Sequence, residues 1–284
     1  MFGNNVIHGK STFEDNLQNN ELVYTTTFPT LQGEGPHSGK RCVFIRLTHC
    51  NLACSFCDTY FDNPNVISIP DLYNLIVDDK NDWLEKNGGS GDNWGIVVTG
   101  GEPGLQAEML AEFFYYAFSY TDFSWMQVES NGILPFRNLP DYVDLVCSPK
   151  CVEKYNIPIK YLQPHADNIN RVNYLKFVIN ADPNSIYHNV PKWALTWSAA
   201  RKIPIYVSPM NMYLKEPQKV LEAAKSNKEI PEEDRIDVME KISFWEEGLL
   251  DMKKNRANHE YTALLCMRHG FIMSLQTHLL ASLP

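Results

Sequence analysis

Three cysteines, Cys50, Cys54 and Cys57, stand close together in the segment CNLACSFCDTY. Thiolates at this spacing can hold three corners of a 4Fe–4S cube, because one short loop can wrap around the metal. Asp58 occupies the position where a fourth cysteine would close the site. A site with three thiolates leaves one coordination position open, which a chemically active metal centre needs. The same segment also permits a three-cysteine zinc site completed by His49 or Asp58.

The number of cysteines, seven in a chain of this length, favours a reducing compartment. An odd count in a long chain argues against a disulfide framework, so cytoplasmic localisation is expected. Cys147 and Cys151 repeat the x3 spacing, but no third cysteine lies near them in the sequence to complete a second cluster. Cys42 and Cys266 are most simply interpreted as buried thiols.

Net charge and hydropathy exclude several classes of partner. The 284-residue chain has a formal net charge of −9. A broad nucleic-acid surface requires an excess of Lys and Arg, so no nucleic-acid partner is expected. No apolar run approaches the ~20 residues that span a bilayer. Residues 1–20 lack the apolar and basic segments of a signal peptide, so no membrane partner is expected either.

Strand-like segments alternate with helical or loop segments along most of the chain, which is typical of an α/β fold with a mostly parallel sheet. Residues 131–141 are too few and too broken by prolines to form a full crossover helix. The predicted fold is therefore an incomplete, partial barrel with mostly parallel strands. Strands are expected at 21–28, 41–47, 94–98, 125–130, 142–148, 173–180, 203–209 and 271–278, and helices at 70–87, 105–118 and 258–269.

The whole chain, 1–284, is predicted to be a single domain. Its core is expected to comprise about 21–211 and 258–284. The charged stretch at about 214–256 is predicted to be a helical insertion outside the catalytic core.

Polar and glycine-rich motifs follow several of the expected strands. They are TGGEP (99–103), VESNG (128–132), SPK (148–150) and SPMN (208–211). The carboxyl ends of parallel barrel strands meet on one face, where ligands bind. We therefore expect these motifs to lie together, beside the cysteine segment that follows the strand at 41–47.

These segments resemble the radical S-adenosylmethionine (SAM) superfamily, in which SAM completes the coordination of the open iron. Within it, LQGEGPHSGKRCVFIRLTHCNLACSFCDTY (31–60) is similar to the 7-carboxy-7-deazaguanine synthase family. The likeness covers 24–60, recurs at 94–104, 128–132, 148–150 and 203–211, and returns at LQTH near the C-terminus. It implies a radical SAM barrel. It also implies that the enzyme contracts the ring of 6-carboxy-5,6,7,8-tetrahydropterin to 7-carboxy-7-deazaguanine with loss of ammonia, in queuosine-type deazapurine biosynthesis.

The resemblance also implies cofactors, partners and residue roles. The cofactors are a 4Fe–4S cluster on Cys50, Cys54 and Cys57, SAM, and Mg²⁺ bound by Thr59. The partners are the pterin substrate, an electron donor such as flavodoxin, and a second copy in a homodimer. The SAM site is implied to comprise Phe56, Cys57, Asp58, Gly101, Glu102, Ser130, Ser148, Pro149, Lys150, Ser208, Pro209, Met210 and Asn211. The substrate site is implied to comprise Leu31, Gln32, Gly33, Arg46, Thr99, His278 and Pro284, the last through its terminal carboxylate.

Simpler roles remain open for several of these residues. Arg46 would otherwise pair with Glu34 or Glu102, Thr59 would cap a turn, and His278 would pack near the sheet. The chain also departs from the family at Ser208, where the family often has Gln. This departure favours a SAM contact through the backbone there. The stretch at 214–256 lies outside the resemblance.

Two other functions are compatible with the cysteine segment. An activase of a glycyl radical enzyme would share the cluster and TGGEP, but not LQGEG, the Asp58–Thr59 pair or the C-terminal QTH. A zinc-binding interaction module would use the cysteines structurally. The colour of anaerobically reconstituted protein distinguishes the zinc module from a radical enzyme, because an iron–sulfur protein is brown and a zinc protein is colourless.

We predict that replacing Cys50, Cys54 or Cys57 with Ala abolishes reductive SAM cleavage, because only these three thiolates lie within one short loop. Cys147→Ala and Cys151→Ala are expected to keep SAM cleavage and serve as controls. The measurement is 5′-deoxyadenosine formation by reconstituted protein. Equal loss in both groups would contradict a single cluster.

Overall fold

The computed structural model describes residues 20–57, 59–154, 157–212 and 252–277. Of the predicted site residues, Asp58, His278 and Pro284 lie outside these ranges. Most of the predicted helical insertion, up to residue 251, also lies outside them.

A nine-stranded sheet forms the body of the molecule, in the order β11-β10-β9-β6-β5-β4-β2-β1-β3. All neighbours from β2 through β11 are parallel, whereas β1 is antiparallel to β2 and β3 is antiparallel to β1. In the described part of the chain β11 and β3 are edges, so the predicted incomplete, mostly parallel barrel is confirmed. The strands are β1 (Glu21–Leu31), β2 (Arg41–Leu47), β3 (Asn65–Ser68), β4 (Gly95–Gly100), β5 (Trp125–Ser130), β6 (Val143–Cys147), β9 (Tyr174–Ile179), β10 (Ile205–Pro209) and β11 (Ile272–Met273).

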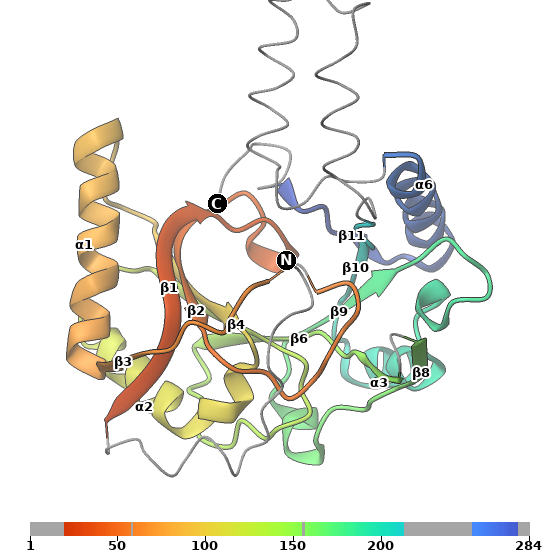
Figure 1. The fold of residues 1–284 in the computed structure, drawn as a ribbon, viewed down its shortest axis with the longest axis horizontal. Helices are drawn as coiled ribbons and strands as arrows, with labels where there is room; N and C mark the ends of the chain where they lie inside the picture. The colour runs from red at the N-terminus through yellow and green to blue at the C-terminus, as the bar shows by residue number, and fades with distance from the viewer. Residues whose placement is uncertain (1–19, 58, 155–156, 213–251, 278–284) are drawn as a thin grey trace, which may run out of the picture.

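Helices cover the outer, convex face of this curved sheet (Figure 1). They are α1 (Ile69–Asn87), α2 (Ala107–Phe118), α3 (Lys192–Arg201) and α6 (Met252–His269). Helix α1 begins at a clear signal: the Ser68 hydroxyl accepts a hydrogen bond from the Asp71 N–H, and Pro70 stands in the first turn. None of the helices in the described ranges combines the length and apolar composition needed to cross a bilayer.

The side chains of the central strands alternate between two environments. Residues such as Val43, Ile96, Val128 and Phe177 point to the helices and form the hydrophobic core. The intervening residues point to the opposite, inner face, because successive side chains of a strand alternate. The polar members of that inner face are Arg46, Thr99, Gln127, Glu129, Asp144, Lys176 and Ser208.

Several elements differ from the prediction. The structure has an additional strand β3, a hairpin of β7 (Cys151–Lys154) and β8 (Ile157–Tyr161), and α3. The hairpin is mostly exposed and buries only Cys151, so its sequence has no clear alternation of apolar residues. Helix α3 packs Trp193, Ala194 and Trp197 on the core, but it has only ten residues, which is too short for a strong helical pattern. The last helix begins at Met252 rather than at 258, and the last strand is reduced to β11.

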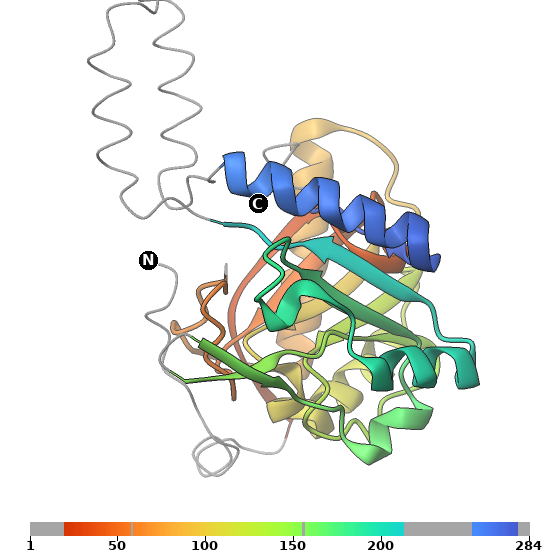
Figure 2. The same ribbon diagram turned by 90° about the vertical axis from the view of Figure 1, so that its right-hand side faces the viewer.

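Short 3-10 turns complete the fold: η3 (Gly35–His37), η4 (Pro103–Gln106), η5 (Ala166–Asn170) and η6 (Ile186–His188). No helix forms between β5 and β6, as the prolines of that connection predict. Helix α6 runs along β10 (Figure 2), and its first turns lie beside the carboxyl end of that strand, where Asn255 and Asn258 contact Met212 and Met210.

Candidate active site

The cysteine loop leaves the carboxyl end of β2 and lies directly on the end of β4. The N–H of Gly101 donates to the Leu47 carbonyl (3.0 Å), and the N–H of Glu102 donates to the His49 carbonyl (2.7 Å). A Cβ on Gly101 would stand 1.6 Å from the His49 oxygen. A Cβ on Gly100, whose φ is +122°, would stand 2.3 Å from the backbone of Leu47. Glycine is therefore required here because two backbones touch, and this contact fixes where the cysteine loop starts.

Glu102 joins the ends of β4 and β5. One carboxylate oxygen accepts from the Ser130 hydroxyl (2.5 Å) and the Gly104 N–H (2.8 Å), and the other accepts from the Asn131 N–H (2.8 Å). Burial raises the pKa of Glu102, and these hydrogen bonds oppose that rise by favouring the carboxylate. The side chain therefore fixes two of the predicted ligand-binding motifs relative to each other.

Two further contacts bind the cysteine loop to neighbouring strand ends. The Asn131 side-chain amide donates to the Asn51 oxygen (2.8 Å). Burial raises the pKa of the Cys54 thiol to about 12, and the nearby ammonium of Lys150 opposes this rise. Burial lowers the pKa of Lys150, whose ammonium donates to the Ser148 carbonyl at 2.8 Å. The predicted SPK motif thus places a positive charge beside a predicted cluster ligand.

The donor set of this loop fits an iron–sulfur cluster in its chemistry. Cys50, Cys54 and Cys57 are partly exposed thiols of one loop. Burial raises the pKa of Cys50, and the nearby Glu102 carboxylate raises it further, followed by Cys54 and Cys57. The Cys57 N–H donates to the Cys54 carbonyl (3.1 Å), which turns the loop between them. Among the described residues, no three His, Cys, Asp or Glu side chains are grouped closely enough to hold a metal ion. The cluster-ligand roles therefore stay predictions.

The connection between β1 and β2 crosses the inner face of the sheet. It is closed on itself by backbone hydrogen bonds between Gln32 and residues 39 and 40. The Gly35 N–H donates to the Ser274 hydroxyl (2.9 Å), and the His37 ring contacts the Asp144 carboxylate (2.8 Å). Residues 32–40 therefore line the inner face from β6 to the C-terminal segment, and we call them the floor loop.

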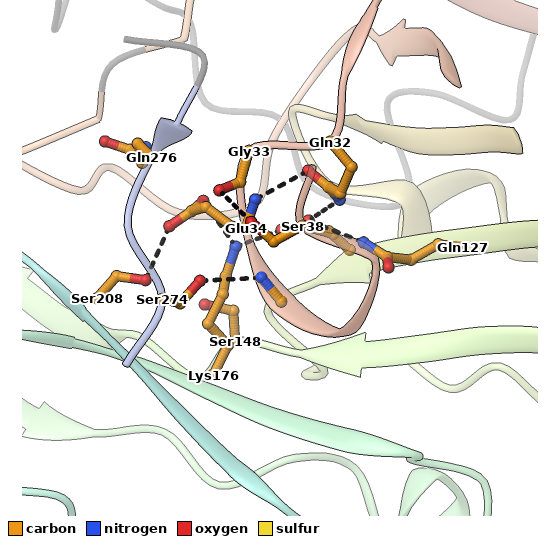
Figure 3. Close-up of polar contacts among 12 residues, drawn as sticks. Gln32, Gly33, Glu34, Ser38, Gln127, Ser148, Lys176, Ser208, Ser274 and Gln276 are labelled. Carbon is orange, nitrogen blue, oxygen red and sulfur yellow. Dashed lines mark hydrogen bonds and ion pairs between the residues drawn. The ribbon is translucent and has the colours of Figure 1, made fainter. Parts of the chain in front are cut away.

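A buried charge network joins the floor loop to the sheet (Figure 3). The Lys176 ammonium donates to Glu34 (3.0 Å) and forms a second ion pair with Glu129. The other oxygen of Glu129 accepts from the side-chain amides of Gln32 (2.9 Å) and Gln127 (3.0 Å). Burial would lower the pKa of Lys176, but the carboxylates of Glu129 and Glu34 outweigh it and raise the pKa. Lys176 is therefore held as a cation.

The predicted SPMN motif is fixed by the same network and by α6. The Ser208 hydroxyl donates to the second oxygen of Glu34 (2.8 Å). From α6, the Asn258 side chain donates to the Met210 carbonyl (2.7 Å), and Asn255 bonds both the N–H and the carbonyl of Met212. Phe56 packs on the small buried cluster that contains Met210, so the cysteine loop and SPMN are neighbours.

The segment before the predicted His278 lies on the floor loop. The Thr277 N–H donates to the Gly33 carbonyl (3.3 Å), and the Asn211 side chain bonds the Gln276 side chain. Thr277, the residue before His278 in the LQTH motif, thus lies beside Gly33. Arg46 and Thr99 are partners in the register of β2 and β4. The Arg46 guanidinium stands 5.3 Å from the centre of the Phe28 ring.

The predicted TGGEP, SPK and SPMN motifs therefore lie at the carboxyl ends of β4, β6 and β10. Arg46, Thr99 and Ser208 lie on the inner face of the sheet, and Leu31 pairs with Arg41 at the amino end of β2. Sequence reasoning missed Glu34, Gln127, Glu129 and Lys176 as members of the site. The alternation of WMQVES, and a single lysine inside the apolar strand YLKFVI, are signals that could have found three of them.

A separate cavity of about 570 Å³ lies between α2 and residues 137–141. Its lining includes Glu108, Glu112, Tyr115 and Arg137 and none of the predicted site residues. It is therefore distinct from the site built on the inner face of the sheet.

Related proteins are found for this chain both by sequence and by structure. The model of the radical SAM superfamily matches residues 44–181. A 7-carboxy-7-deazaguanine synthase of Rickettsia prowazekii is 30% identical over 98% of this chain and 94% of its own length. One from Methanospirillum hungatei is 27% identical over 71% of this chain and 78% of its own. The crystal structure of QueE from Escherichia coli aligns over 90% of this chain and 93% of that one, with a TM-score of 0.51 at 16% identity, which shows the shared fold.

We predict that Lys176→Met lowers the free energy of unfolding by ~3–5 kcal/mol, because it leaves two buried carboxylates without their cation. Lys176→Arg keeps the charge and is expected to recover part of the loss. The measurement is urea denaturation at neutral pH.

Lys80→Met is the matched control for this prediction. Lys80 is equally buried, but its partner Asp122 is exposed by about a third, so water solvates the carboxylate that remains. A smaller loss, ~1 kcal/mol, is expected there. Equal losses in the two variants would show that the Lys176 network is no more than an ordinary ion pair.

Proposed function

This chain belongs to the 7-carboxy-7-deazaguanine synthase family of radical SAM enzymes, and on that premise we propose that it converts 6-carboxy-5,6,7,8-tetrahydropterin to 7-carboxy-7-deazaguanine with loss of ammonia. Such a reaction supplies the deazapurine of queuosine-type biosynthesis. The relative from Rickettsia prowazekii, named for this activity, covers almost the whole chain.

One observation of the structure carries the proposal. The cysteine loop, the strand-end motifs and the polar floor loop, which are far apart in the sequence, face the same side of one incomplete barrel. A radical enzyme needs its radical source and its substrate site to be adjacent and shielded from water. The paired amides and charges of the inner face hold the floor loop in place, and the backbone groups of that loop are proposed to contact the substrate.

The residues at the cysteine end are proposed to hold the cofactors. Cys50, Cys54 and Cys57 would ligate the 4Fe–4S cluster. When bound, the cluster and SAM supply the 5′-deoxyadenosyl radical that takes hydrogen from C6 of the pterin. The proposed SAM site comprises the described residues Phe56, Cys57, Gly101, Glu102, Ser130, Ser148, Pro149, Lys150, Ser208, Pro209, Met210 and Asn211, and also Asp58. For Glu102, whose oxygens already bond to the protein, positioning of neighbouring backbone is the supported role.

The residues of the floor loop and of β2 are proposed to bind the substrate. Leu31, Gln32 and Gly33 would contact the pterin ring, chiefly through backbone groups. Arg46 would bind the substrate carboxylate with its planar two-donor fork, beside Thr99. Lys176 and Glu129 hold Gln32 in place, so the loop is ordered before the substrate arrives. His278 and Pro284 are proposed as further contacts; they follow Thr277, which lies on Gly33.

The remaining parts of the proposal concern partners and location. Thr59 would supply an oxygen ligand to Mg²⁺, a cation that prefers oxygen donors. The cluster would take its electron from a small donor protein such as flavodoxin. A cytoplasmic homodimer is proposed from the family and from the free thiols of the described cysteines.

The test is turnover of 6-carboxy-5,6,7,8-tetrahydropterin by anaerobically reconstituted protein with SAM, Mg²⁺ and a reductant. We expect 7-carboxy-7-deazaguanine and ammonia in equal amounts, identified by mass spectrometry. Protein with Cys54→Ala is the control for background chemistry. If SAM is cleaved but the pterin is unchanged, the chain is a radical SAM enzyme with another substrate.

Arg46→Lys tests the substrate-carboxylate contact. The variant keeps the positive charge but loses the planar pair of donors, so kcat/KM for the carboxypterin is expected to fall more than tenfold. SAM binding should be unchanged, as measured by isothermal titration calorimetry. A variant with near wild-type turnover would assign Arg46 to the structure, through its contact with Phe28, rather than to the substrate.

A further inference from the structure

We propose that Glu34 is a positioning residue for SAM: it holds the hydroxyl of Ser208 in the orientation in which that oxygen accepts a hydrogen bond from SAM. The inference rests on the proposed function only in taking the end of β10 as part of the SAM site. The donors that SAM can offer are its ribose hydroxyls and its amino groups.

The geometry of Ser208 fixes the direction of its proton. A serine hydroxyl has one proton to donate and two lone pairs to accept with. A carboxylate only accepts, so the 2.8 Å contact with Glu34 uses the proton of Ser208. The lone pairs of the Ser208 oxygen are then left for a donor. Ser208 is 3% exposed and stands at the carboxyl end of β10, on the inner face.

Glu34 is held in its acceptor form by the charge network. Its other oxygen receives the Lys176 ammonium at 3.0 Å, and Lys176 is itself anchored on Glu129. Lys150 lies close enough for its charge to interact with Glu34, Glu129 and Lys176. A carboxylate paired with a buried ammonium is more stable ionised than protonated. Figure 3 shows Glu34 lying between Ser208 on one side and Lys176 on the other.

Replacing Glu34 with the equally shaped but neutral Gln would reverse the direction in which the Ser208 hydroxyl points its proton. In Glu34→Gln the amide oxygen must face the Lys176 ammonium, which cannot accept a hydrogen bond. The amide NH₂ then faces Ser208, whose oxygen must accept. The Ser208 proton turns toward SAM and meets a donor instead of an acceptor. The variant therefore removes a favourable hydrogen bond to SAM and leaves a poorly matched buried pair.

The experiment is a double-mutant cycle on SAM affinity. Reconstituted wild type, Glu34→Gln, Ser208→Ala and the double variant are compared at matched iron content, with the SAM dissociation constant measured by equilibrium dialysis. We expect each single variant to bind SAM about tenfold more weakly, as loss of one buried hydrogen bond predicts. The double variant is expected to bind no more weakly than Ser208→Ala alone, because Glu34 acts through Ser208.

Three results would overturn the inference. They are an unchanged dissociation constant in Glu34→Gln, an unchanged one in Ser208→Ala, or a Glu34→Gln effect of equal size in the Ser208→Ala background. The last would show that Glu34 acts by a general effect on the floor loop. Asp122→Asn is the matched control, because it neutralises a carboxylate bonded to a buried lysine away from the site, and its SAM affinity should equal wild type. Pterin turnover by the wild type is measured separately, so failure of the proposed function and failure of this inference are distinguishable.

Discussion

The ion pairs of Lys176 are the constraint on which the inner side of this molecule depends. Removing a lysine and two carboxylates from water costs several kcal/mol for each charge, and only close pairing and further hydrogen bonds offset that cost. Here the amides of Gln32 and Gln127 and the hydroxyl of Ser208 complete the shell around Glu34 and Glu129. These groups come from four segments, the floor loop, β5, β9 and β10, so the pairing holds the floor loop against all three strands.

A second constraint acts at the other end of the site, through backbone rather than charge. Gly100 and Gly101 let the end of β4 touch the chain just before the first cysteine, at a distance no side chain would permit. The resemblance implies that Gly101 of this motif belongs to a SAM site. The structure adds that the two glycines leave space for the cysteine loop itself. The start of the cysteine loop is therefore positioned by the sheet.

Between these two constraints lies a surface that can carry radical chemistry. Lys150 connects them electrostatically, since it stands near Cys54 on one side and near Lys176, Glu34 and Glu129 on the other. The asparagines of α6 hold the end of β10 from outside the sheet. The residues proposed for the cofactors and those proposed for the substrate thus share one supporting network, so a substitution in the floor loop is expected to affect SAM as well as the pterin.

The cysteine spacing, the parallel sheet and the incomplete barrel were determined by the sequence itself, because each depends on residues close together in the chain: thiols in one loop, apolar strands of period two, prolines between β5 and β6. The hairpin β7–β8 was not predicted because it is mostly exposed, and α3 was not predicted because its apolar residues cover only ten positions. The charged centre of the site was decided only by the tertiary structure. Lys176 meets Glu34 across 142 positions of sequence and Glu129 across 47. No local periodicity records such a meeting, since a charge is stable in the interior only where folding brings its counter-charge beside it.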